Sequence, residues 1–147
     1  MMDDITMAFA LAQESHGDQM YGDKPYIYHL QEVLRLCQEA GMPIEYQIVA
    51  ILHDVVEDTD CPSERIKRLF GHVIWEAVNH ITHLKNEDYF NDYLPKVKEN
   101  DIAKNVKLFD LLSNLEHAIL KPNRYGKLIK KYQKALFVLM QDSGKVL

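Results

Sequence analysis

The stretch Ile48–Asp58 reads IVAILHDVVED and says more about the expected structure than any other part of this 147-residue chain. Its five leading apolar residues predict the buried centre of a helix that starts near Glu45. The polar residues that follow share one helical face: His53, Asp54, Glu57 and Asp58. We therefore expect one continuous helix whose buried turns lead directly into a histidine and carboxylate cluster.

This cluster conflicts with the local rules of helix stability. Each pair of like charges three or four residues apart costs a few tenths of a kcal/mol, and negative charge near a helix C-terminus costs about 0.3–1 kcal/mol. A divalent cation would remove the conflict, because it binds both histidine nitrogen and carboxylate oxygen. The alternative is the solvated end of an amphipathic helix. That reading explains Glu57 and Asp58 but not the histidine and aspartate that follow directly on apolar turns.

The rest of the chain also predicts helices. With only 6 Gly and 5 Pro, it lacks the frequent turn signals of a β-sandwich or barrel. We expect one all-α domain, residues 1–147, with seven or eight helices. The expected segments are about Asp4 to Gly17, His29 to Gly41, Glu45 to Asp58, Pro62 to Gly71, Val73 to Thr82, a broken helix within Asn86 to Asn100, Asp101 to Leu120, and Tyr125 to Gln141.

Composition excludes several partners. The net charge of −5, from 22 acidic and 17 basic residues, argues against binding to nucleic acid or to an anionic membrane surface. No apolar run approaches the roughly 20 residues that span a bilayer, and the N-terminus shows no secretory signal. Cys37 and Cys61 lie far apart and suit a reducing compartment. We therefore expect a cytoplasmic protein.

A metal bound after the apolar run needs further ligands from elsewhere. His29 is one candidate, although a lone histidine at a helix start is often a cap or a surface residue. Asp110, in the stretch KLFDLLSN, is another. There Lys107, Asp110 and Asn114 recur at helical spacing, so they also fit the solvent face of an ordinary amphipathic helix. Periodicity does not separate these two interpretations.

Taken together, His29, His53-Asp54 and Asp110 resemble the ligand set H…HD…D of HD-domain metal-dependent phosphohydrolases. The resemblance is closest to the alarmone hydrolases, which comprise the hydrolase domain of RelA/SpoT proteins and the small stand-alone enzymes. It extends over about residues 5–120. The matching stretches are FA at 9–10, HG at 16–17, PYIYH at 25–29, HDVVEDT at 53–59, FG at 70–71, and KLFD at 107–110 with Asn114.

The resemblance implies a role for each matching residue. The metal ligands would be His29, His53, Asp54 and Asp110, with Mn²⁺ as the usual ion. A nitrogen and oxygen ligand set without thiolate is also compatible with Fe²⁺ or Co²⁺ and argues against structural zinc. Glu57 and Asp58 would be the catalytic pair that orients and deprotonates a metal-bound water. Asn114 would face the same cavity and contact the substrate.

The chain departs from the family at positions that recognise the nucleotide. The alarmone hydrolases usually carry an Arg-Lys pair eight or nine residues before the first metal histidine, where this chain has Met20 and Tyr21. Their downstream pattern DRxHNxR here reads DLLSNLE, with Leu111 and Glu116 in place of the two arginines. The catalytic pattern is therefore intact, whereas the recognition pattern is not.

Other residues offer substitute contacts to a substrate. Tyr21 can stack on a base, and Lys24, Lys85 or Lys107 can contact phosphate. The leading hypothesis is a (p)ppGpp-type 3′-pyrophosphohydrolase, or a close relative acting on another phosphorylated nucleotide. The alternatives are a nucleotide 5′-phosphohydrolase of the wider HD superfamily, a non-catalytic nucleotide-binding regulator and a metal-free helical scaffold.

Overall fold

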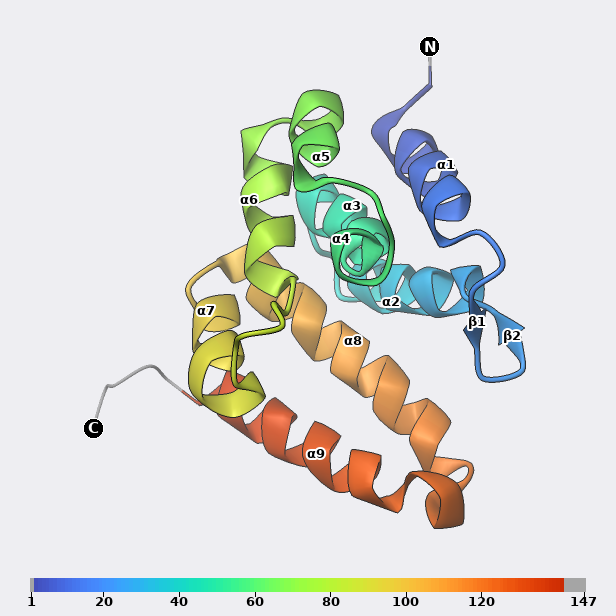
Figure 1. Ribbon diagram of the computed structural model, residues 1–147, viewed down its shortest axis with the longest axis vertical. Helices are drawn as coiled ribbons and strands as arrows, with labels where there is room; N and C mark the ends of the chain where they lie inside the picture. The colour runs from blue at the N-terminus through green and yellow to red at the C-terminus, as the bar shows by residue number, and fades with distance from the viewer. Residues whose placement is uncertain (1, 142–147) are drawn as a thin grey trace.

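The computed structural model describes residues 2–141, which form an all-α fold with one very short β-hairpin (Figure 1). The expected fold class is confirmed. The elements in chain order are α1 (Asp4–His16), β1 (Met20–Tyr21), β2 (Lys24–Pro25), α2 (Ile27–Glu39), α3 (Ile44–Leu52), α4 (Val55–Asp58), α5 (Ser63–Phe70), α6 (His72–Ile81), the π-helical turn η1 (Tyr89–Tyr93), α7 (Leu94–Lys98), α8 (Asp101–Ile119) and α9 (Pro122–Met140).

Helix α3 is the centre of the molecule. It packs against α1, α2, α6 and α8, and Figure 1 shows it enclosed by these elements. The run Ile48–Leu52 is buried at every position, which explains why the second half of this helix is apolar on all sides. Because α3 lies inside the bundle, the residues that follow it begin their course in the interior rather than at the surface.

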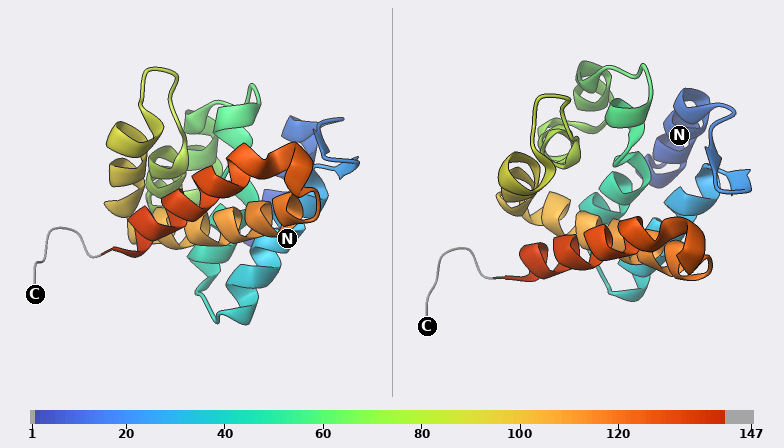
Figure 2. Two further views of the ribbon diagram at one scale, coloured as in Figure 1. Left: turned by 90° about the horizontal axis from the view of Figure 1, so that it is seen from below. Right: turned by 60° about the horizontal axis from the view of Figure 1, so that its bottom comes forward.

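Helices α8 and α9 lie side by side as an antiparallel pair, as both views of Figure 2 show. The side chain of Asn100 caps α8 by accepting the backbone N–H of Ala103 at 2.9 Å. The start of α9 is kinked at Tyr125, where φ is −115°. Since α8 also packs against α2 and α3, its middle turns face the end of α3.

The prediction of one continuous helix through Ile48–Asp58 is wrong, because the helix breaks after Leu52. The ring Nδ1 of His53 donates to the carbonyl oxygen of Ala50 at 2.7 Å. Asp54 follows with φ −104° and ψ −1°, far from ideal helical angles, and His53 and Asp54 form a turn between the two helices. A new short helix, α4, then begins, with the backbone N–H of Asp58 bonded to the carbonyl of Asp54 at 2.9 Å. The break occurs at the His-Asp pair itself.

The segment at residues 86–100 agrees with its predicted structure, whereas the segment at residues 20–25 adds a hairpin. The broken helix predicted within residues 86–100 is confirmed as η1 and α7, with Pro95 in the first turn of α7. The antiparallel pair β1 and β2, which pairs Met20 with Pro25 and Tyr21 with Lys24, lies between the first two helices, where the sequence predicted no strand. Across residues 2–141, every helix is too short or too polar to cross a bilayer.

Candidate metal centre

Four side chains from three separate parts of the chain meet at one point. His29 comes from the first turn of α2, His53 and Asp54 from the break between α3 and α4, and Asp110 from the middle of α8. Each offers one potential ligand atom, and these atoms all lie within 4.8 Å of one another. The structure thus brings together the four residues that the sequence pattern proposed as metal ligands.

Asp110 and Asp54 lie between the two imidazole rings. Asp110 Oδ1 lies 2.9 Å from His29 Nε2 and 3.2 Å from His53 Nε2. Asp54 Oδ2 lies 3.0 Å from His53 Nε2 and 3.9 Å from His29 Nε2. Both rings therefore present the same nitrogen to the same two carboxylates.

The hydrogen bonds of the rings show that this donor set fits a cation. A carbonyl oxygen only accepts, so His53 Nδ1 carries the proton that it donates to Ala50. In the neutral ring, Nε2 then has a lone pair that faces Asp54 and Asp110, which also offer lone pairs. These groups repel one another unless a proton or a cation lies among them. A divalent ion with nitrogen and oxygen ligands meets this requirement.

The pKa shifts of the centre show that its buried groups interact strongly with one another. Burial alone would lower the pKa of His53, yet the charges of Asp54 and Asp110 outweigh burial and raise it well above its ordinary value. Burial would raise the pKa of Asp54, but the charge of His53 lowers it to about 2. Burial is likewise outweighed at Asp110, where Lys107 and His53 hold the pKa well below its usual range. Both carboxylates are therefore ionised at neutral pH, as metal ligands must be.

Glu57 and Asp58 lie beside the cluster on α4. Glu57 Oε1 accepts the backbone N–H of His83 at 2.7 Å, which fixes its side chain. Carboxylate oxygens of Asp54, Glu57 and Asp58 lie within 4.8 Å of one another, and burial raises the pKa of both Glu57 and Asp58. Carboxylates with raised pKa values next to a metal ligand are suited to accept a proton from water.

Tyr26 is a contributor to the site that sequence reasoning missed. Its hydroxyl donates to the carboxylate of Asp54 and lies 3.4 Å from Asp58 Oδ2. The ring of His16 stacks on Tyr26 at 4.5 Å between centroids. The sequence does contain a feature that could have identified Tyr26. It lies three residues before His29, a spacing that brings both side chains to the start of α2.

Lys107 serves the centre in a different way from the predicted phosphate contact. Its Nζ lies 3.1 Å from Asp110 Oδ2, and it lies near the rings of Tyr89 and Tyr93. Burial would lower its pKa, but Tyr93 and Asp110 raise it well above the ordinary value. Its positive charge thus already pairs with a carboxylate of the centre, and contact with a substrate phosphate stays a prediction.

Tyr21 and Asn114 also contact the centre directly. The ring of Tyr21 stacks on the ring of His29 with 4.4 Å between centroids and 20° between planes. Its hydroxyl donates to Asn114 Oδ1 at 2.6 Å, and Asn114 Nδ2 donates to Asp110 Oδ1 at 3.3 Å. Both residues were expected to contact a substrate, and in this structure they contact metal-centre residues.

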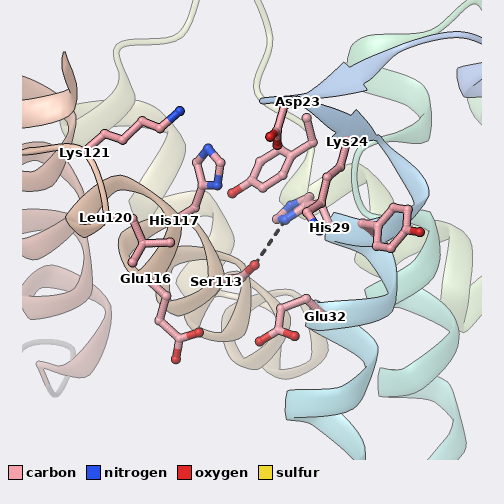
Figure 3. A pocket seen from close by; sticks show the side chains of 11 residues that line it. Asp23, Lys24, His29, Glu32, Ser113, Glu116, His117, Leu120 and Lys121 are labelled. Atoms are coloured by element: carbon pink, nitrogen blue, oxygen red, sulfur yellow. Dashed lines mark hydrogen bonds between the residues drawn. The ribbon is translucent and has the colours of Figure 1, made fainter.

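An open cavity of about 540 Å³ lies on the other side of His29, between the β-hairpin, α2 and α8 (Figure 3). Tyr21 and His29 form part of its wall, and Lys24 lines it, whereas the other three clustered side chains are absent from its lining. Figure 3 shows Ser113 in this cavity, with its hydroxyl 3.3 Å from His29 Nδ1. The volume is typical of small-molecule pockets, but the cavity opens behind the metal centre.

Comparison with known proteins finds a family match and relatives that cover most of the chain. Its sequence matches the HD domain family over residues 8–124. It is 32% identical over 122 residues to a guanosine-3′,5′-bis(diphosphate) 3′-pyrophosphohydrolase of Aquifex aeolicus, a match that covers 78% of this chain and 18% of the relative. It is 33% identical over 115 residues to the 3′-pyrophosphohydrolase MESH1 of Danio rerio, a match that covers 71% of this chain and 63% of that protein.

Two more matches define the extent of the similarity. A probable GTP pyrophosphokinase of Mycobacterium leprae is 37% identical over 82 residues, 54% of this chain and 10% of the relative. The chain thus spans less than two thirds of the length of each of these three relatives. A solved structure of a metazoan SpoT ortholog that hydrolyses ppGpp matches with a TM-score of 0.82 and 24% identity, over 95% of this chain and 87% of that one. The two proteins share a fold.

Proposed function

Because this chain belongs to the HD-domain family, we propose that it is a metal-dependent pyrophosphohydrolase of guanosine 3′,5′-bis(diphosphate), or of a close nucleotide relative, that releases the 3′-diphosphate. The observation that carries this proposal is the buried cluster of two histidines and two aspartates, with Glu57 and Asp58 beside it. The names of the relatives from Aquifex aeolicus and Danio rerio support the substrate class.

The side chains around the centre suit hydrolysis of a phosphate ester. A divalent ion held by the four clustered residues would acidify a water and offset negative charge on the phosphoryl oxygens. Glu57 is fixed through Oε1 by the His83 N–H, so its carboxylate is oriented to accept the proton of that water. Asp58 provides a second carboxylate within 4.8 Å of the first. Tyr26 orients Asp54 through its hydroxyl.

The ligand chemistry favours Mn²⁺ as the ion. The cluster offers imidazole nitrogen and carboxylate oxygen and no thiolate. Such mixed sets suit Mn²⁺, and Fe²⁺ or Co²⁺ as alternatives, better than they suit a structural zinc ion. The metal dependence of turnover and of binding distinguishes among these three ions.

The domain organisation, the cellular location and the class of partner are also proposed. The proposed domain comprises residues 1–147, and the packing of the described helices, within residues 2–141, on one hydrophobic core supports it. The free thiols of Cys37 and Cys61 support a reducing, cytoplasmic location. The net charge of −5 supports a small phosphorylated nucleotide as the partner rather than nucleic acid or a membrane.

A second candidate activity has its own supporting observation. Met20 and Tyr21 stand where the alarmone hydrolases usually carry two basic residues, and Tyr21 already engages Asn114. A nucleotide with fewer phosphates needs fewer basic contacts. The second candidate is therefore a phosphohydrolase that releases orthophosphate from a nucleotide. A non-catalytic nucleotide-binding regulator has less support, because it does not need Glu57 and Asp58.

Product analysis separates these candidates. The purified protein is incubated with Mn²⁺ and a panel that includes guanosine 3′,5′-bis(diphosphate) and mono-, di- and triphosphate nucleotides, and pyrophosphate and orthophosphate are measured separately. We expect pyrophosphate and guanosine 5′-diphosphate from the first substrate, and no product with the Asp54→Ala variant. Orthophosphate alone would support the second candidate. Nucleotide binding without turnover would support a regulator and overturn the proposal.

A further inference from the structure

Tyr21 makes more contacts with the metal centre than its place in a two-residue strand suggests. Its ring stacks on the ring of His29 at 4.4 Å between centroids and contacts the ring of His117 at 4.7 Å. Its hydroxyl donates to Asn114 Oδ1 at 2.6 Å. One side chain thus links the β-hairpin to the first turn of α2 and to two successive turns of α8.

The hydrogen bond from Tyr21 continues into the centre through Asn114. Asn114 Oδ1 accepts from Tyr21, while Nδ2 donates to Asp110 Oδ1 at 3.3 Å. That same Asp110 oxygen lies 2.9 Å from His29 Nε2. Tyr21 therefore acts on His29 through its ring and on Asp110 through its hydroxyl, and both atoms of the Asn114 amide group are already bonded within the protein.

The hairpin turn is built to hold Tyr21 in this place. Gly22 follows Tyr21 with φ +63°, a conformation that side chains with a Cβ rarely adopt. A Cβ at this position would lie 2.8 Å from Cε1 of His117. The turn backbone therefore lies against the His117 ring of α8, beside the contacts that Tyr21 makes with His29 and Asn114.

We propose that Tyr21 is a positioning residue of the metal centre and not a base-stacking contact. Tyr21 holds the His29 ring in its orientation by stacking on it. Through Asn114, it also fixes the position of the Asp110 oxygen that His29 faces. Tyr21 and His29 also line the cavity on the other side of His29 from the cluster. This inference rests on the metal centre of the proposed function.

The test compares the Mn²⁺ affinity of three variants. The electron paramagnetic resonance signal of free Mn²⁺ measures how much of the ion each variant binds. Tyr21→Leu removes both contacts, and we expect 10–100-fold weaker binding, the range found when groups that orient metal ligands are removed. Tyr21→Phe keeps the ring and loses the hydroxyl, and we expect about a threefold to tenfold loss, the usual net contribution of one hydrogen bond. The matched control is Tyr28→Phe, because Tyr28 precedes His29 on α2 but has an exposed ring, over which Lys24 Nζ lies. It should bind within twofold of the parent protein.

Kinetic constants and metal-free melting temperatures complete the test. A positioning role lowers kcat and metal affinity together in the Tyr21 variants while KM at saturating Mn²⁺ changes little. Unchanged Mn²⁺ affinity in Tyr21→Phe and Tyr21→Leu, with a raised KM, would show a substrate contact and overturn the proposal. If the leucine variant does not fold, Tyr21→Phe decides, and unchanged Mn²⁺ affinity there overturns the proposal. The inference and the proposed activity can fail separately. If Mn²⁺ affinity falls from the parent protein to Tyr21→Phe and further to Tyr21→Leu, but the parent protein does not cleave guanosine 3′,5′-bis(diphosphate), the inference is supported and the proposed activity is refuted.

Discussion

At the scale of single residues, the two histidines of the centre are held in the same way. His53 Nδ1 donates to the Ala50 carbonyl, and His29 Nδ1 lies 3.3 Å from the hydroxyl of Ser113. In each ring this contact leaves Nε2 to face the carboxylates, an arrangement typical of histidines that bind metals. The motif spacing in the sequence identified both rings. It did not identify Ser113 as a partner, because that contact depends on how α8 packs against α2.

Glu57 is the residue whose replacement best separates catalysis from metal binding. We expect Glu57→Gln to lower kcat by 10²–10⁴-fold, the usual contribution of a general base, because the amide cannot accept the proton of water. The glutamine oxygen still accepts the His83 N–H, so the fold and the affinity for Mn²⁺ should be retained. Steady-state kinetics and Mn²⁺ titration measure the two effects.

Asp60→Asn is the matched control for that variant. Asp60 is an exposed acid two residues beyond Asp58 and is outside both clusters of potential ligands. Its replacement should leave kcat within about twofold of the parent value. Equal losses in the two variants would mean that removal of negative charge, and not the loss of a specific base, lowers turnover.

At the scale of elements, the break between α3 and α4 is the feature that places the chemistry. The apolar run before it correctly predicted a central buried helix, because each of its side chains is covered in the structure. Helical periodicity could not predict the break, since it arises where the His53 ring bonds to the Ala50 carbonyl. Local sequence thus indicated which residues share the site, while tertiary contacts determined how the backbone turns them inward.

The β-hairpin offers a stability test at the same scale. Gly22→Ala places a Cβ at φ +63° and 2.8 Å from His117 Cε1, so we expect a loss of about 1–2 kcal/mol in the free energy of unfolding. Gly126→Ala is the matched control, because it lies within α9 and its Cβ would meet nothing within 4 Å. There we expect a gain of about 0.5–1 kcal/mol, since alanine favours helix more than glycine does. Urea denaturation checks both values. A Gly22→Ala protein as stable as the parent would contradict the close packing of the hairpin on α8.

At the scale of the whole molecule, the centre joins segments that are far apart in the sequence. α2, the segment after α3 and α8 each contribute proposed ligands, so the complete site exists only in the folded chain. Mn²⁺ at 100 times its dissociation constant should therefore stabilise the fold by about 2.7 kcal/mol. For a domain of this size, that corresponds to a rise of about 10 °C in Tm. Differential scanning fluorimetry with and without a chelator measures the shift. The absence of any shift at saturating Mn²⁺ would mean that the site does not bind the ion.

Fold class and ligand set could both be predicted from sequence, for different reasons. Helical periodicity accounts for most of the described chain and so predicted the fold class. The apolar run before HDxxED predicted a site at His53 and Asp54, whereas His29 and Asp110 were proposed as ligands only through the resemblance to HD-domain phosphohydrolases. The roles of Tyr21 and Lys107 could not be predicted in this way. Lys107 pairs with Asp110 on its own helix, and Tyr21 reaches α8 only because the hairpin folds back on it. The Tyr21 contact depends on packing between distant segments, whereas helical spacing already places Lys107 beside Asp110 and leaves open only whether the pair faces the buried centre.

The stoichiometry of Mn²⁺ binding tests the central claim most directly. Isothermal titration of the metal-free protein should show one ion bound per chain, confirmed by elemental analysis after gel filtration. Asp54→Ala, which removes one carboxylate from the cluster, should bind no Mn²⁺ under the same conditions while remaining folded by circular dichroism. A parent protein that binds no ion, or a folded Asp54→Ala protein that binds one with unchanged affinity, would contradict the assignment of the metal centre.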